Sequence, residues 1–283
     1  MSRIIGVHEV GGEAFWREFR EVMGGEGTLM TYRYLGTWAQ IDQPKLRASG
    51  SMAVRSDMRG PTGLQAAPLI ILVADVIGVL ADAIAVPAPA QMTLDLLDRG
   101  DGVRRVGCRG EMVHAGRKQL FGKAVIFDAD DESRLLAVFR DADAVMAPAP
   151  DGYERVETGE GPPDNGALPP LWQAFGGEQR GAEFAIAQLT PEIGSTSASL
   201  HHGVTHILLE AAAQAAQQAG ASGKPARLAH WHVTFTARGK TGPFVTRTRT
   251  IGESAGRQAL DIDLFDEGEG RLIASATAIY AED

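Results

Sequence analysis

The residues best suited to chemistry stand at the start of a helix-like run in the second half of the chain. The run HHGVTHILLE opens with His201, His202 and Gly203, and its acid, Glu210, follows two helical turns after Gly203. The first backbone N–H groups of a helix are unpaired and lie at the positive end of its dipole, so they stabilise a carbonyl oxygen on which negative charge develops. A glycine at this point allows a ligand to approach the backbone closely. The pattern predicts attack on a carbonyl compound, with a carboxylate as base or nucleophile.

A second helix-like run carries an acid in the first half. The run APLIILVADVIGVLAD ends at Asp82, and its Asp75 lies 210 − 75 = 135 residues before Glu210. Asp82 and Gln217 are separated by the same offset, 217 − 82 = 135. An apolar helix is expected to raise the pKa of Asp75 toward a range useful for catalysis. A buried carboxylate that only binds the backbone or a partner side chain is the structural alternative.

The chain contains an internal repeat. The segment AGRKQLFGKAVIFDADDESRLLAVF, from Ala115, pairs with AGRQALDIDLFDEGEGRLIASA, from Ala255, and Gly116 matches Gly256 at an offset of 256 − 116 = 140. Between the copies, residues 147–170 are rich in proline, glycine and acids, which is typical of a linker. We therefore predict a tandem duplication, with one half at residues 1–146 and the other at residues 171–283.

Each half has the same predicted order of elements, which indicates an α+β fold. A short helix with aromatic residues (EAFWREFREVM or PLWQAF) precedes a strand (LRASGSMAVR or AEFAIAQL), one long apolar helix and four strands. The four strands are QMTLDLL, VRRVGCRGEMVHA, KQLFGKAVIF and LLAVFRDADAVM in the first half, and ARLAHWHVTFTA, GPFVTRTRTIG, RQALDIDLF and RLIASATAIYA in the second. A helix that is apolar almost all round must be covered on most of its surface, so we expect a curved antiparallel sheet to wrap around it.

This arrangement resembles the hotdog-fold thioesterases and dehydratases, in the fused double-hotdog form. The most specific feature is the entry to the central helix, where the phenylacetate-pathway type of acyl-CoA thioesterase has His-Gly-Gly, six residues, and an acid. His201, His202 and Gly203 fill these positions in the second half, with Glu210 as the acid; Ala66, Ala67 and Pro68 fill them in the first half, with Asp75 as the acid. The first half thus lacks the histidine and both glycines, and the second has histidine for the first glycine and glutamate for the usual aspartate.

The resemblance implies that each site combines the helix start of one half with the acid of the other. One candidate site joins His202 and Gly203 to Asp75, and the second joins Ala67 to Glu210. Only the first is expected to be fully competent, because Pro68 has no N–H to donate. The implied reaction is hydrolysis of an acyl-CoA thioester to the free acid and coenzyme A, and it needs no cofactor.

Two rival functions follow from the same motifs. The run LLEAAAQAA resembles the central helix of hotdog dehydratases, whose catalytic histidine lies about fourteen residues before the glutamate; Thr196 occupies that position here, which argues against dehydration or hydration of an acyl thioester. A noncatalytic acyl-binding protein is the other alternative, since the first half has drifted from the motif. That function predicts that Asp75 is hydrogen-bonded away from any cleft.

The other histidines allow two further interpretations. His206 lies one helical turn after His202, and His230 and His232 share a strand face, so a metal site is geometrically possible; without cysteine partners or a zincin motif we predict none. His201 either caps the helix or takes part in catalysis.

Other side chains have ordinary explanations beside a functional one. Arg247 and Arg249 share a strand face and either bind the phosphates of coenzyme A or form an exposed charged face. Cys108 lies in an alternating strand pattern and is expected to be a buried, inert thiol.

Composition limits the class of protein and its partners. The 283 residues carry 27 basic and 36 acidic side chains, for a net charge of −9, and no basic cluster that would bind nucleic acid. Acids and prolines interrupt the most apolar stretch, residues 64–90, so no membrane span is expected. A single cysteine and the absence of a signal-like opening favour the cytoplasm. Open sheet edges or faces make a homodimer of the fused unit plausible.

Overall fold

Twelve strands form one antiparallel sheet. The computed structural model describes residues 30–42, 46–148, 160–195, 199–220 and 226–282. The sheet strands of the first half are β1 (Trp38–Asp42), β2 (Arg47–Ala53), β5 (Ala85–Leu96), β6 (Arg105–Ala115), β7 (Gln119–Asp128) and β8 (Asp131–Pro148). Those of the second half are β9 (Glu178–Arg180), β10 (Glu183–Ile186), β11 (Ala226–Phe235), β12 (Phe244–Ser254), β13 (Arg257–Asp266) and β14 (Arg271–Glu282). Their order is β1-β2-β6-β7-β8-β5-β11-β14-β13-β12-β10-β9, so each half supplies one side of the sheet.

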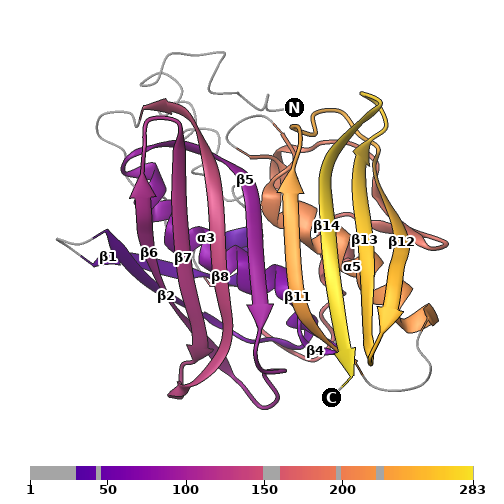
Figure 1. Cartoon of the computed structure of the whole chain (residues 1–283), viewed down its shortest axis with the longest axis horizontal. Helices are drawn as coiled ribbons and strands as arrows, with labels where there is room; N and C mark the ends of the chain where they lie inside the picture. The colour runs from indigo at the N-terminus through magenta and orange to yellow at the C-terminus, as the bar shows by residue number, and fades with distance from the viewer. Residues whose placement is uncertain (1–29, 43–45, 149–159, 196–198, 221–225, 283) are drawn as a thin grey trace.

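Two long helices, α3 (Ala66–Asp82) and α5 (His202–Gly220), lie on the same face of this sheet, as Figure 1 shows. The short elements are the helices α2 (Met30–Leu35) and α4 (Leu171–Ala174), the single turns η1 (Ser56–Met58) and η2 (Pro191–Ile193), and a hairpin of β3 (Arg59–Gly60) and β4 (Gly63–Leu64). The strands predicted from sequence alternation are confirmed, and PLWQAF contains α4. The helix predicted at residues 13–23 lies outside the described residues.

The apolar sequence of α3 is explained by its surroundings. It packs against β1, β2, β5, β6 and β7 and also against α5, and every side chain from Ala66 to Ile77 is buried. Each fully buried leucine or isoleucine contributes about 1.5–3 kcal/mol to folding. In the second half, α5 packs on β10, β12, β13 and β14. None of the described helices is long and apolar enough to cross a membrane.

The two halves meet where β5 pairs with β11. In the antiparallel register Thr93 lies opposite His232, and Met92 lies opposite Val233. These positions are related by the repeat, because 232 − 92 = 140 and 233 − 93 = 140. Equivalent residues thus exchange places across the seam, as the self-complementary contact of a two-fold pair requires. The offset of 140 inferred from the Gly116 and Gly256 turns therefore recurs at the junction between the halves.

The segment before α4 is docked on the first half. The carboxylate of Asp164 accepts hydrogen bonds of 2.7 Å from both the N–H and the hydroxyl group of Ser56. Gly161 lies against the turn at Gly36, where an added Cβ would stand 2.7 Å from the Gly161 nitrogen. This segment therefore holds the chain between α2 and β1 in place.

Candidate functional site

The N-terminus of α5 begins against α3, one turn before Asp75. A Cβ added at Gly203 would lie 3.0 Å from Ile71 Cγ1 and 3.0 Å from Thr31 Cγ2. Because Gly203 has no side chain, α5 packs closely against α3 and α2 on that side, and their atoms fill the space. The start of α5 and Asp75 thus lie on adjoining helices, with Gly203 against Ile71, four residues before Asp75.

His201 caps α5. The Gly203 N–H donates to His201 Nδ1 at 3.1 Å, and the Thr31 hydroxyl lies 3.1 Å from the same nitrogen. Because a backbone N–H can only donate, Nδ1 is an acceptor and the proton of the neutral ring is on Nε2. Burial holds the pKa of His201 well below its usual range, which keeps the ring neutral. The structure thus shows the capping role, and the Gly203 N–H already has an acceptor within the protein.

The short helix α2 connects the α5 start to Asp75. Gly36, at φ 65°, ends the helix, with the N–H groups of Gly36 and Thr37 bonded to the carbonyls of Arg33 and Tyr32, both at 3.1 Å. This pattern is a Schellman motif, which folds Thr37 back toward Tyr32. The Tyr32 hydroxyl lies 3.0 Å from His202 Nε2, and the Thr37 hydroxyl donates to Asp75 Oδ2 at 2.8 Å. One turn of backbone therefore places a hydroxyl group on each side of the candidate site.

The second half repeats this backbone motif without its hydroxyl groups. Gly176, at φ 77°, ends α4, and Gly177 N–H donates to Trp172 O at 2.7 Å. These residues are equivalent to Gly36, Thr37 and Tyr32, since 176 − 36 = 140, 177 − 37 = 140 and 172 − 32 = 140. The two pseudo-equivalent sites thus share their architecture and differ in polar side chains.

The equivalent glycines provide a matched test of the α2 turn. An alanine at either Gly36 or Gly176 would pay about 1–2 kcal/mol for the left-handed backbone. Only at Gly36 would the new Cβ also meet backbone, because the space around Gly176 is open within 4 Å. We therefore expect Gly36→Ala to lower the free energy of unfolding by about 1–3 kcal/mol more than Gly176→Ala in urea denaturation. Equal losses would show that the contact with Gly161 relaxes freely.

The N-terminus of α3 is closed by a carboxylate from the other half. Buried Glu210 accepts hydrogen bonds of 2.7 Å from the N–H groups of both Ala66 and Ala67. Burial raises its pKa to about 7, although these two bonds oppose the shift. Glu210 and Ala67, which the family resemblance assigns to one site, are therefore in contact, and the helix N–H groups at this second candidate site already have an acceptor.

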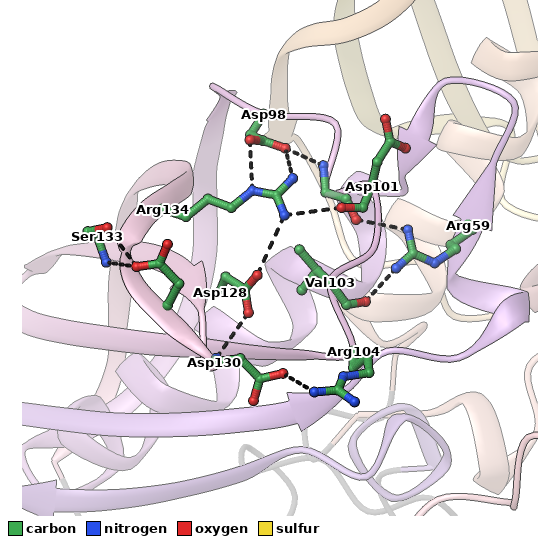
Figure 2. Close-up of polar contacts among 11 residues, drawn as sticks. Arg59, Asp98, Asp101, Val103, Arg104, Asp128, Asp130, Ser133 and Arg134 are labelled. Carbon is green, nitrogen blue, oxygen red and sulfur yellow. Dashed lines mark hydrogen bonds and ion pairs between the residues drawn. The ribbon is translucent and has the colours of Figure 1, made fainter.

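A polar network holds the approach to α3 (Figure 2). From β8, Arg134 donates to both carboxylate oxygens of Asp98, at 3.0 and 2.8 Å, and to the carbonyl of Asp101 at 3.1 Å. From the hairpin before α3, Arg59 donates to the carbonyls of Gly100 and Val103 at 3.0 and 2.5 Å. The loop between β5 and β6 is thus fastened on both sides, which positions the hairpin that leads into the α3 N-terminus.

The other histidines predicted as candidates have hydrogen-bond partners away from the α5 start, although the ring centroid of His206 lies 6.4 Å from that of His202. His206 is fully buried, accepts a 3.1 Å bond from Trp231 Nε1 and lies 3.4 Å from Met92 Sδ. On the sheet, His230 pairs with Asp95 at 2.7 Å and His232 lies 2.8 Å from the Thr93 hydroxyl. Within the described ranges, no group of three or more His, Cys, Asp or Glu residues is placed to hold a metal ion.

Two further predictions concern β12 and β6. Arg247 and Arg249 are exposed and paired with Glu267 at 3.1 Å and Asp261 at 2.8 Å, so a phosphate would have to compete with these carboxylates. Cys108 is buried, and burial raises the pKa of its thiol, which makes it a poor nucleophile.

The fold of the chain is similar to that of several solved structures. No protein-family model matches the chain, and no curated protein shows significant sequence similarity to it. A conserved protein of unknown function with a hot dog fold from Alicyclobacillus acidocaldarius matches with a TM-score of 0.59 and 10% identity, over 90% of this chain and 98% of that one. The chain has a hotdog fold. Two other matching structures have names that indicate function. They are an acyl-CoA thioesterase II from Mycobacterium marinum (TM-score 0.56, 12% identity, 89% and 98% of the two chains) and a 12:0-ACP thioesterase from Umbellularia californica (0.53, 10%, 90% and 99%).

Proposed function

We propose that this protein is an acyl-CoA thioesterase made of two fused hotdog units, with its working site where Asp75 of α3 adjoins the start of α5. The names of the hotdog neighbours support thioester hydrolysis, and they include both an acyl-CoA and an acyl-ACP enzyme. Coenzyme A is the carrier that we propose, and the acyl-carrier-protein ester is the alternative that the experiment below compares.

The observation that carries the proposal is the difference between the two helix starts. At α3, the N–H groups of Ala66 and Ala67 both donate to Glu210. At α5, the His202 N–H has no acceptor among the described residues. An oxyanion needs a donor that is not already satisfied, so the α5 start is the better of the two sites for a carbonyl oxygen.

The chemistry then follows from the side chains around that helix start. Asp75 takes a proton from a water molecule as the water oxygen attacks the carbonyl carbon, and the Thr37 hydroxyl holds the carboxylate in position. The carbonyl oxygen gains negative charge and is stabilised by the His202 N–H. When the carbonyl re-forms, the thiolate of coenzyme A leaves and receives the proton from Asp75. Direct attack by the Asp75 carboxylate, followed by hydrolysis of the anhydride, is the variant of this mechanism.

A panel of thioesters tests the proposal. We expect the wild-type protein to release free thiol from acyl-CoAs of different chain length, with a higher kcat/KM for at least one of them than for the matching acyl-ACP. Thiol release is measured with a chromogenic disulfide reagent against a no-enzyme control. If tight binding of acyl-CoA accompanied an unchanged background rate for every ester, the noncatalytic acyl-binding function would replace this proposal.

A further inference from the structure

The ring of His202 has one nitrogen bonded and one without a partner. Its Nε2 lies 3.0 Å from the Tyr32 hydroxyl, while its Nδ1 is shielded from solvent and has no hydrogen-bond partner within the described residues. An unpaired buried polar atom is costly, and a catalytic role is one of the reasons for which native proteins keep such an atom. This nitrogen belongs to the same residue as the backbone N–H that lacks an acceptor, so the two groups lie close together at the α5 start.

The charge and tautomer of the ring decide what Nδ1 can do. Burial lowers the pKa of His202 to about 4, so the ring is neutral at pH 7 and carries one N–H. The contact with Tyr32 is compatible with either direction; when the phenol hydroxyl donates to Nε2, the ring proton is on Nδ1. The neighbouring ring of His201 is fixed in the opposite tautomer by the Gly203 N–H, although the two ring centroids are only 4.1 Å apart.

We propose that Tyr32 holds His202 as the Nδ1–H tautomer, and that this ring N–H and the backbone N–H of His202 together bind the carbonyl oxygen of the thioester. The inference rests on the thioesterase function proposed above and assigns a side-chain donor to its oxyanion site. In the reaction the ring N–H donates a hydrogen bond and keeps its proton, because the proton taken from water is carried by Asp75. His202 is thus a catalytic residue, and Tyr32 is a positioning residue that acts through it.

Substitutions at His202 distinguish the two ring nitrogens. In His202→Asn the side-chain amide nitrogen takes the place of Nδ1, whereas in His202→Gln it takes the place of Nε2. We expect His202→Asn to keep kcat within about tenfold of the wild type and His202→Gln to lower kcat about 10²-fold with little change in KM, because only the first retains a donor to the oxyanion. Equal activity of the two variants would contradict the proposed role of Nδ1.

Tyr32→Phe removes the hydroxyl and preserves the packing of the ring. We expect about a tenfold lower kcat in the wild-type background and no further loss in the His202→Asn background, where no tautomer has to be fixed. An equal loss in both backgrounds would show that Tyr32 acts only on the stability of α2.

Nuclear magnetic resonance reads the tautomer without requiring activity. In ¹⁵N-labelled wild-type protein at pH 7, long-range ¹H–¹⁵N correlations of the His202 ring are expected to show the Nδ1–H form, and Tyr32→Phe is expected to shift it toward Nε2–H. An Nε2–H ring in an active wild type would overturn this inference alone. Failure of the wild type to hydrolyse any ester would overturn the proposed function, and the oxyanion role with it.

Discussion

Asp75→Asn is expected to lower kcat for acyl-CoA hydrolysis by about 10²- to 10⁴-fold, because the amide can neither take a proton from water nor attack the carbonyl carbon. The substitution preserves shape, and the amide oxygen can still accept the hydrogen bond from the Thr37 hydroxyl. The loss should therefore appear in kcat, with KM and the free energy of unfolding close to those of the wild type.

Glu210→Gln is the matched comparison, because Glu210 is the equivalent acid of the other half. Its carboxylate binds the N–H groups of Ala66 and Ala67 at the start of α3. It therefore does not contact the reacting atoms at the proposed site. We expect this variant to keep kcat within about threefold of the wild type at pH 7, provided that circular dichroism shows it folded. Full turnover by Asp75→Asn together with loss of turnover in Glu210→Gln would move the working site to the N-terminus of α3.

The repeat could be predicted because it depends on spacing, whereas the pairing of each helix start with the acid of the other half was implied by the family resemblance. Gly116 and Gly256 mark equivalent hairpin turns, and the same offset of 140 relates the strands that join the halves. The acids at Asp75 and Glu210 fall at one position of two apolar helices. Long periodic segments of this kind retain their pattern through duplication, so the sequence alone supported the repeat and its order of elements.

The segment that completes the site could not be predicted in the same way. The helix α2 has only six residues, too few for a hydrophobic period, and the role of Tyr32 and Thr37 depends on contacts with distant chain segments. The available signal was Gly36 at the end of MTYRYL, a typical helix stop that has its equivalent at Gly176. Aligning these two glycines would have extended the repeat upstream to the short helices α2 and α4.

The difference between the acids was visible in the sequence, but its consequence was not. Glutamate is one methylene longer than aspartate, and Glu210 reaches the N-terminus of α3. Asp75 is instead bonded to Thr37, whose equivalent is Gly177 and has no side chain. The longer side chain of Glu210 and the loss of one hydroxyl group in the second half thus explain why the two helix starts differ. The start of α3 is bound by Glu210, whereas the start of α5 keeps an N–H donor without an acceptor among the described residues.

Glu210 should also make the stability of the protein depend on pH in a defined direction. Burial raises its folded-state pKa to about 7 from an ordinary value of 4.5, so the folded state binds the proton more tightly than the unfolded state does. The contribution of Glu210 to the free energy of unfolding is then largest below pH 4.5 and is lost as the pH rises through 7. By linkage the loss between the fully protonated and the fully ionised state is roughly 3 kcal/mol.

Comparison with Glu210→Gln isolates this contribution, because glutamine does not titrate while all other groups stay the same. Asp141, whose pKa burial raises to about 6, titrates in both proteins and cancels in the difference. At pH 5 we expect the variant to be less stable, since its amide group presents N–H donors to one of the two N–H groups that Glu210 binds. Between pH 5 and pH 8 the free energy of unfolding of the wild type should fall by about 2–3 kcal/mol relative to that of the variant, as measured by urea denaturation. A difference that stays constant over this range would mean that the two hydrogen bonds from Ala66 and Ala67 outweigh burial and that Glu210 is ionised throughout.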